Sequence, residues 1–200
     1  MNKVLAIIIA LLPLITMGQV RVGDVALDGG KVSTVYVDGK NGNLNWVGFT
    51  CPNDGDVIDQ FITIANEDVK KFRTALNEAI IKKNEWDRKA AENGIDEYQH
   101  ELPIEFPLVK FMWGVDKKYK STSTFHLWYY KKGNDSRLLI RSNASKVADS
   151  IHNYKTFSMD FTDMEQVRQL INLMSQDNIN AALEQTKSTK KQTPLWKIFE

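Results

Sequence analysis

The chain lacks most of the residue patterns that identify an enzyme from sequence. Its 200 residues include one cysteine, Cys51, and three histidines, His100, His126 and His152. A single cysteine cannot form an internal disulfide. The sequence contains no C-x-x-C, no P-loop and no G-x-S-x-G pattern. We therefore predict no cofactor. A hydrolase with an active site dispersed over several loops remains an alternative function.

An excess of one charge is also missing, since 26 Lys and Arg face 25 Asp and Glu. A neutral chain lacks the basic field of a typical nucleic-acid-binding protein. We therefore expect a glycan, a peptide or another envelope protein as the partner. Single-stranded nucleic-acid binding is kept as a second alternative, because rings and arginines occur together in one part of the chain.

The one long apolar run lies at the start of the chain. Lys3 precedes the run Val4–Met17, and Gly18 is a small residue at the spacing that a signal peptidase accepts. We predict cleavage after Gly18, which leaves a chain of 182 residues with 25 basic and 25 acidic side chains. The run is short for a membrane span, although an uncleaved anchor is the alternative. A signal peptide without a disulfide framework predicts a secreted or periplasmic bacterial protein.

Turn signals and apolar periodicity predict an α+β fold. From Gln19 to Thr63 short strand patterns alternate with Gly, Asp and Asn turns, and strand patterns return from Leu108 to Phe161. Asn66 is expected to cap a helix that ends near Asn93-Gly94, with a polar second half that projects beyond the core. Asp163 is expected to open a second helix, extended after a kink over 178–183. The apolar stripes of the two helices are Val69, Phe72, Leu76 and Ile80, and Val167, Leu170, Ile171 and Met174.

The two helices are each preceded by about four strand candidates, so the sequence predicts antiparallel sheets with helices on one face and a repeated ββββα plan. This element order resembles the duplicated plan of the PUR and Whirly single-strand-binding folds, in element order alone. The expected organisation is a signal peptide (1–18), two β-rich halves that each end in a helix (19–94 and 95–183), and a flexible segment with an apolar tail (184–200). The two halves are expected to form one compact domain.

The strongest binding candidate is an aromatic strand, Ser121–Tyr130, and the strand that follows its polar turn. Strand side chains alternate between faces, so an inward Phe125 and Leu127 would place three candidate rings on the opposite face. A hairpin would set two arginines beside them, and such a surface can stack a sugar, a base or a peptide side chain. The alternative is that these rings are core. The candidate ligand-binding residues are His126, Trp128, Tyr130, Arg137 and Arg141.

Weaker patterns complete the sequence-based predictions. Acidic turns at 38–43 and 53–56 suggest calcium, but Lys40 stands where a ligand is needed, so no metal site is predicted. Residues 95–107 are expected to be a solvated connector, although Glu97, Glu101 and Glu105 recur there. Asp149-Ser150-Ile151 resembles an acceptor for bacterial O-glycosylation at Ser150. Cys51 is expected to be buried, and the apolar tail at 194–199 is expected to dock on the domain.

Overall fold

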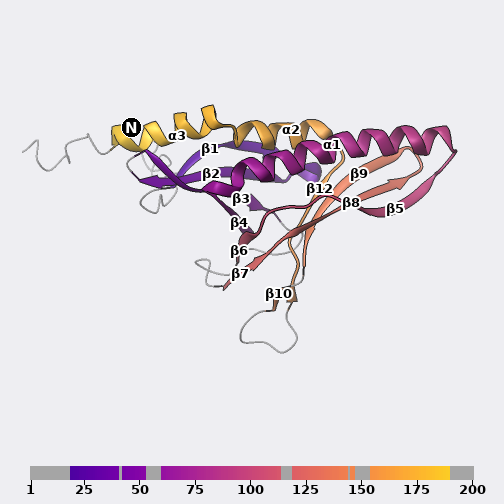
Figure 1. Ribbon diagram of the computed structural model, residues 1–200, viewed down its shortest axis with the longest axis horizontal. Coiled ribbons are helices and arrows are strands. Elements are labelled where there is room, and N and C mark those ends of the chain that lie inside the picture. Colours follow the sequence, from indigo (N-terminus) through magenta and orange to yellow (C-terminus); the bar gives the residue numbers. More distant parts are fainter. Residues whose placement is uncertain are drawn as a thin grey trace, which may run out of the picture.

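The computed structural model describes residues 19–40, 42–52, 60–113, 119–143, 145–146 and 154–189. In these residues antiparallel strands form two main sheets, and three α-helices lie along one side of both sheets (Figure 1). The predicted α+β class, with antiparallel sheets and helices on one face, is confirmed. We call the helix-covered side of each sheet the upper face and the opposite side the lower face, as Figure 1 shows them.

The larger sheet has six strands and contains the whole N-terminal meander. Two strands from later in the chain extend it beyond β4. In spatial order its strands are β1 (Gln19–Ala26), β2 (Val32–Lys40), β3 (Asn43–Cys51), β4 (Gln60–Ala65), β6 (Val109–Trp113) and β7 (Tyr119–Ser123). β1 is one strand across Gly23-Asp24, with an irregular register between Arg21 and Gly23.

The smaller sheet has four strands and carries most of the aromatic hairpin. In spatial order its strands are β12 (Ser158–Phe161), β9 (Asp135–Ser142), β8 (Phe125–Lys132) and β5 (Glu97–Leu102). A short separate ladder pairs β10 (Ser145–Lys146) with β11 (Tyr154–Lys155). Four strands in chain order, β5, β8, β9 and β12, thus precede the second helix. The element order between α1 and α2 is longer than the predicted ββββα unit, because β6 and β7 are inserted between β5 and β8 and β10 and β11 between β9 and β12.

Strand β5 corrects the prediction of a solvated connector at 95–107. The residues of β5 pair with β8 without interruption, from Glu97 opposite Lys132 to Leu102 opposite Leu127. Five of its six side chains are exposed, and Leu102 alone is buried. The segment lacks apolar alternation because it lies at a sheet edge, where strand pairing does not require buried side chains.

The two sheets are joined by one long hairpin that bends. β5 continues into β6, and β7 continues into β8, so each arm of the hairpin belongs to both sheets. Between the two paired regions, residues 103–108 on one arm oppose only 124–126 on the other. Thr124 Oγ1 donates a hydrogen bond of 2.9 Å to the carbonyl of Phe106 across this bend. The unequal lengths force a change of strand direction there.

The helices begin and end close to their sequence signals, with two differences. A 3₁₀ turn (Asn66–Asp68) precedes α1 (Val69–Glu92), and no side-chain hydrogen bond caps either, so the predicted Asn66 cap is wrong. α2 (Met164–Leu173) is capped as predicted, because Asp163 accepts a hydrogen bond from Glu165 N. After a break, α3 (Gln176–Thr189) includes residues 184–189, which the sequence assigned to a flexible segment.

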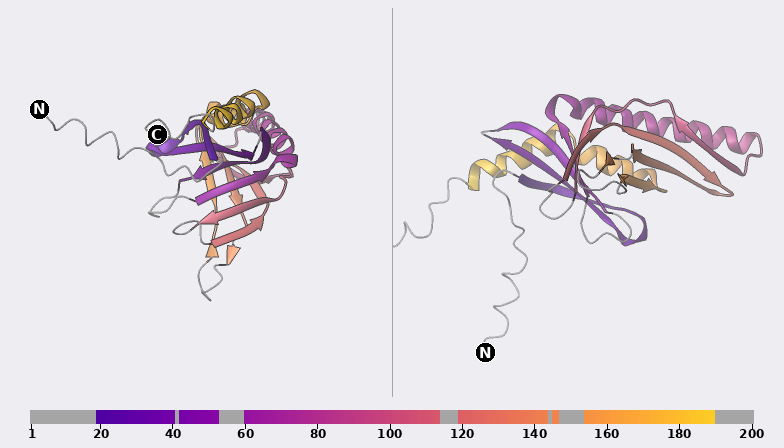
Figure 2. Two further views of the ribbon diagram at one scale, coloured as in Figure 1. Left: turned by 90° about the vertical axis from the view of Figure 1, so that its left-hand side faces the viewer. Right: turned by 90° about the horizontal axis from the view of Figure 1, so that it is seen from below.

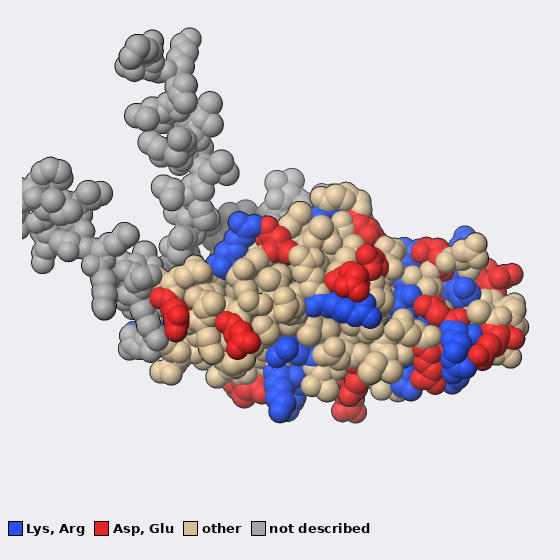
Figure 3. Space-filling view, turned by 90° about the horizontal axis from the view of Figure 1, so that it is seen from above, with Lys and Arg blue, Asp and Glu red and all other residues tan. Residues whose placement is uncertain are grey.

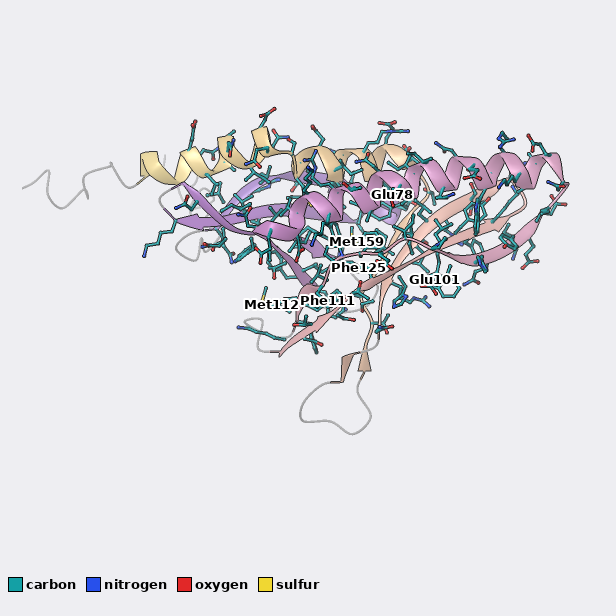
Figure 4. All side chains as sticks on the ribbon, in the orientation of Figure 1. Glu78, Glu101, Phe111, Met112, Phe125 and Met159 are labelled. Carbon is teal, nitrogen blue, oxygen red and sulfur yellow. The ribbon has the colours of Figure 1, made fainter. Side chains whose placement is uncertain are left out.

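A cluster of rings fills the core where the two sheets meet beneath α1. Phe125 of β8 contacts Phe72 of α1 and Phe111 of β6, with ring centroids 5.9 and 5.2 Å apart. Phe111 also stacks on Phe157 at 4.3 Å. Figure 4 shows Phe111, Phe125 and Met159 gathered below the helix from three different strands. One hydrophobic core therefore includes residues of both halves of the chain.

The C-terminal helices cover the N-terminal strands. α3 lies against β1 and β2, and α2 lies against β1, β12 and α1. The packing is close, since a Cβ on Gly39 of β2 would come within 2.5 Å of Leu183 Cδ2. Seen from above, acidic and basic side chains are mixed over the helical side (Figure 3), and Lys82, Glu85 and Lys89 form two ion pairs along α1.

Candidate binding face on the four-stranded sheet

The predicted candidate residues share the lower face of the four-stranded sheet. Phe125, Leu127 and Tyr129 of β8 are buried on the upper face, so the alternating residues point the other way. The register places His126 beside Arg141 and Tyr130 beside Arg137. The view from below shows the strands of both sheets with the helices behind them (Figure 2). The lower-face group, which we call the aromatic–arginine face, is His126, Trp128, Tyr130, Arg137 and Arg141.

An arginine is held over one of the rings. The guanidinium carbon of Arg137 lies 4.6 Å from the centroid of the Tyr130 ring, within the range of a cation–π contact. Arg137 Nη1 also donates to Asp160 Oδ2 at 2.8 Å. Burial opposes the charged form, but Asp160, Asp135 and Tyr130 outweigh it and raise the pKa of Arg137. This guanidinium is therefore a fixed cation on the sheet.

A histidine–glutamate pair stands at the other end of the face. His126 Nδ1 and Glu101 Oε1 of the neighbouring strand β5 are 2.6 Å apart, and both side chains are partly exposed. The second ring nitrogen, His126 Nε2, is shielded from solvent and has no hydrogen-bond partner among the described residues. Asp160 Oδ1, on the opposite edge of the sheet, is in the same situation. Such shielded polar atoms are rare in folded proteins and retain an unused capacity for hydrogen bonding.

Trp128 lies between these two polar pairs. Its cross-strand neighbours are Glu101 on β5 and Leu139 on β9, and Asp160 follows Leu139 across the sheet. Trp128 and Tyr130 are neither fully buried nor fully exposed. The arrangement is a partly exposed indole flanked by ordered charged groups.

The lower face of this sheet carries charges of both signs. Its cations are Lys132, Arg137 and Arg141, and its carboxylates are Glu97, Glu101, Asp135 and Asp160. A single-strand-binding groove needs a positive track for the phosphates as well as rings for the bases. This surface has the rings without the positive track.

Sequence reasoning missed Glu97, Gln99, Glu101 and Asp160 as members of this face. The first three alternate with period two on β5, which is a strand signal, but their polar character and the prolines that follow predicted a loop. The sequence does not single out Asp160, because the apolar residues Met159 and Phe161 on either side of it define the strand alternation there. Its position becomes clear only from the pairing of Asp160 with Leu139.

The upper face of the same sheet holds a buried polar network under α1. Lys83 Nζ, in a side chain only 8% exposed, donates to Asp87 Oδ2 at 2.7 Å and to Ser136 Oγ at 2.8 Å. The Tyr129 hydroxyl donates to Asp87 Oδ1 at 2.8 Å. Burial alone would raise the pKa of Asp87, but these hydrogen bonds outweigh it and lower that pKa, whereas burial and Asp87 raise the pKa of Tyr129.

The second half of α1 covers the four-stranded sheet, so the expectation that it projects beyond the core is wrong. Trp86 packs on the rings of Tyr98, His100 and Tyr129, with centroid distances of 5.7, 5.6 and 5.5 Å. His100 is therefore part of a ring stack on the upper side of β5. It faces away from the aromatic–arginine face.

The six-stranded sheet also presents rings on its lower face, but they pack on one another. The Phe61 ring lies edge-on to Trp46 at 5.6 Å and to Tyr36 at 5.9 Å. It crosses Gly48, where a Cβ would come within 2.6 Å of Phe61 Cζ. Phe61 is only 3% exposed, so this ring cluster closes the sheet surface without a helix.

The remaining chemically interesting residues do not join the candidate face. Cys51 is buried as predicted, and its thiol donates to the carbonyl of Ser158 at 3.2 Å. Glu105 lines a shallow groove with Lys70, Lys71 and other residues near the start of α1. His152, Ser150, the turn at 53–56 and the segments 1–18 and 190–200 lie outside the described residues. Within the described ranges, no group of three or more His, Cys, Asp or Glu could hold a metal ion.

Comparison with known protein families, curated proteins and solved structures gave no match to this chain. Among the residues that the structure describes, no helix combines the length and apolar composition needed to cross a lipid bilayer.

Proposed function

We propose that this protein is an exported bacterial binding module that holds an oligosaccharide on the aromatic–arginine face, without catalysing a reaction. The observation that carries the proposal is the partly exposed Trp128 ring set between two ordered polar pairs, His126–Glu101 and Arg137–Asp160. The apolar N-terminal run, read as a signal peptide, supports export.

The chemistry of the face suits a sugar chain. The C–H faces of a sugar ring can pack on an indole, and its hydroxyls can bond to the carboxylates and guanidinium groups beside it. Binding sites combine an apolar platform with a few oriented polar groups, and these groups are already held by one another here. Holding them in place before binding reduces the entropy lost when a ligand is bound.

The charge balance of the face favours an uncharged ligand over a polyanion. Four carboxylates would repel phosphates, which argues against single-stranded nucleic acid. A dispersed hydrolase site receives no comparable support, because the polar groups on this face are engaged with one another rather than set around a nucleophile.

Tryptophan fluorescence and calorimetry of the chain starting at Gln19 test the proposal, with soluble N-acetylglucosamine oligomers and peptidoglycan fragments as probes. We expect saturable binding that changes little with salt and is lost in Trp128→Ala/Tyr130→Ala while the fold persists. The matched control is Trp46→Ala, which removes a ring from the lower face of the other sheet and should retain binding.

Two outcomes would contradict the proposal. Binding to single-stranded oligonucleotides that weakens steeply with salt would indicate a nucleic-acid site. Equal loss of binding in Trp46→Ala and in the double variant would show that the two ring sets are not functionally distinct.

A further inference from the structure

Strand β5 leaves one edge of the four-stranded sheet open. It pairs with β8 over six consecutive residues with no bulge, and the described residues supply no strand on its other side. Apart from that pairing, the main chain of β5 accepts one described backbone hydrogen bond, from Ile104 N to Leu102 O at 2.8 Å. The strand contains no proline. An edge of this kind offers unpaired N–H and C=O groups to another strand.

Two other sheet edges are better protected. The edge strand β1 has an irregular register and is covered by α2 and α3. The edge strand β12 has only four residues and contacts α2. Proteins commonly protect edges by bulges, short strands or covering helices. β5 has none of these devices among the described residues, and Glu97–Glu101 are all exposed.

The side chains along β5 differ between its two faces. On the upper face, Tyr98 is 40% exposed and stacks with His100 at 6.0 Å, and Trp86 of α1 lies against both rings. This ring group borders the open edge from above. On the lower face, Glu97 and Glu101 border the same edge, with Gln99 between them.

We propose that the open edge of β5 binds an extended peptide by strand addition, and that this peptide alternates apolar and basic side chains. Side chains of an added strand alternate between faces, so every second one would lie beside the Trp86–Tyr98–His100 rings. The others would lie beside Glu97 and Glu101, where opposite charges are favourable cross-strand neighbours. This site shares Glu97 and Glu101 with the lower face of the sheet, but its main chain edge and its upper-face rings take no part in the proposed oligosaccharide site.

A second copy of the chain is a poorer occupant than a basic peptide. Antiparallel pairing of β5 with itself in the register centred on Gln99, which keeps the like faces of two copies together, sets Glu97 opposite Glu101 at both ends of the overlap. Parallel pairing in register does the same. Like charges directly opposite each other destabilise a sheet. The acidic residues therefore discriminate against self-pairing and select a partner of opposite charge.

The test uses the chain from Gln19 and an N-acetylated octapeptide that alternates lysine and valine. Binding is followed by fluorescence anisotropy, and amide hydrogen exchange locates the contact. We expect at least tenfold slower exchange within 97–102 in the complex. A glutamate–valine peptide, and a lysine–valine peptide N-methylated at alternate positions, should each bind at least tenfold more weakly.

Charge reversal at the edge supplies the matched comparison. Glu97→Lys should weaken binding of the lysine–valine peptide at least threefold and strengthen binding of the glutamate–valine peptide. Glu184→Lys, which makes the same change on the exposed side of α3, should leave both affinities unchanged. Binding without slower exchange in β5, equal binding of the N-methylated peptide, or concentration-dependent protection of β5 without peptide would each overturn the proposal.

Discussion

The two sheets expose rings on the same side of the molecule, but the rings have different neighbours. In the six-stranded sheet, Phe61 packs edge-on against Tyr36 and Trp46 and is almost fully buried. In the four-stranded sheet, Tyr130 lies under Arg137, and Trp128 has charged residues on both sides. Rings that pack on one another stabilise a sheet, whereas rings separated by polar groups leave a surface that a ligand can contact.

The largest expected effect comes from breaking the ring cluster of the six-stranded sheet. Phe61→Ala should lower the free energy of unfolding by about 3 kcal/mol, because it removes a buried ring and leaves a cavity. Urea unfolding measures the change. A decrease in the free energy of unfolding of less than about 1 kcal/mol would show that the ring cluster contributes little packing energy to the fold.

The next effect concerns the polar network on the upper face of the smaller sheet. Asp87→Asn should cost about 2 kcal/mol at neutral pH, because it removes the charged partner of the buried Lys83. The pKa of Asp87 is lower folded than unfolded, where it is about 3.9, so its contribution is full above that value and is lost as the pH falls through the lower folded pKa.

Urea unfolding of wild type and Asp87→Asn between pH 7 and pH 3 tests this sign. The difference in the free energy of unfolding should stay constant down to about pH 5 and shrink below about pH 4. A difference that grew in acid would contradict the lowered pKa.

A smaller effect on stability is expected from the aromatic–arginine face. Trp128→Ala should reduce the free energy of unfolding by about 1 kcal/mol or less, because the indole is partly exposed and lies outside the buried core. The comparison with Phe61→Ala is direct, since both variants remove a lower-face ring. Equal destabilisation by the two substitutions would remove the contrast between the sheets.

The smallest effect is expected from Arg137→Ala. The Arg137–Asp160 pair is more than one-third exposed on both sides, so its loss should change the free energy of unfolding by less than about 1 kcal/mol. Oligosaccharide affinity, in contrast, should fall in the same variant. Thermal unfolding and calorimetric titration measure the two quantities separately, and unchanged affinity would exclude Arg137 from the proposed site.

The sequence predicts this face well where alternation is strong. Phe125, Leu127 and Tyr129 alternate with polar or amphipathic residues, and Leu138 and Ile140 alternate with Arg137 and Arg141. The sequence therefore predicts which residues share a face of β8 and of β9, but it leaves open which face is core, because both faces of β8 carry rings. β5 could not be assigned in this way, because an edge strand with Glu97, Gln99 and Glu101 on one face has no apolar period to detect.

Long-range pairing is the part of the fold that local signals do not contain. The strand pattern that begins near Leu108 includes β6, but nothing in it shows that β6 pairs with β4 instead of joining the later sheet. The sequence also does not predict the bend at Thr124, since the pattern of Ser121–Tyr130 is that of one uninterrupted strand. Both features depend on contacts between residues far apart in the chain, which single-sequence periodicity does not record.

The packing of α3 and α2 on the N-terminal strands has a consequence for the order of folding. Gln169 Nε2 donates to the carbonyl of Asp24, and Thr162 Oγ1 donates to Asp28 Oδ2. Until helices from the end of the chain arrive, the upper face of β1 and β2 stays uncovered. Such non-local closure slows folding, because a large loop must close before these contacts form. The chain therefore completes its core only after nearly all of its residues have been synthesised.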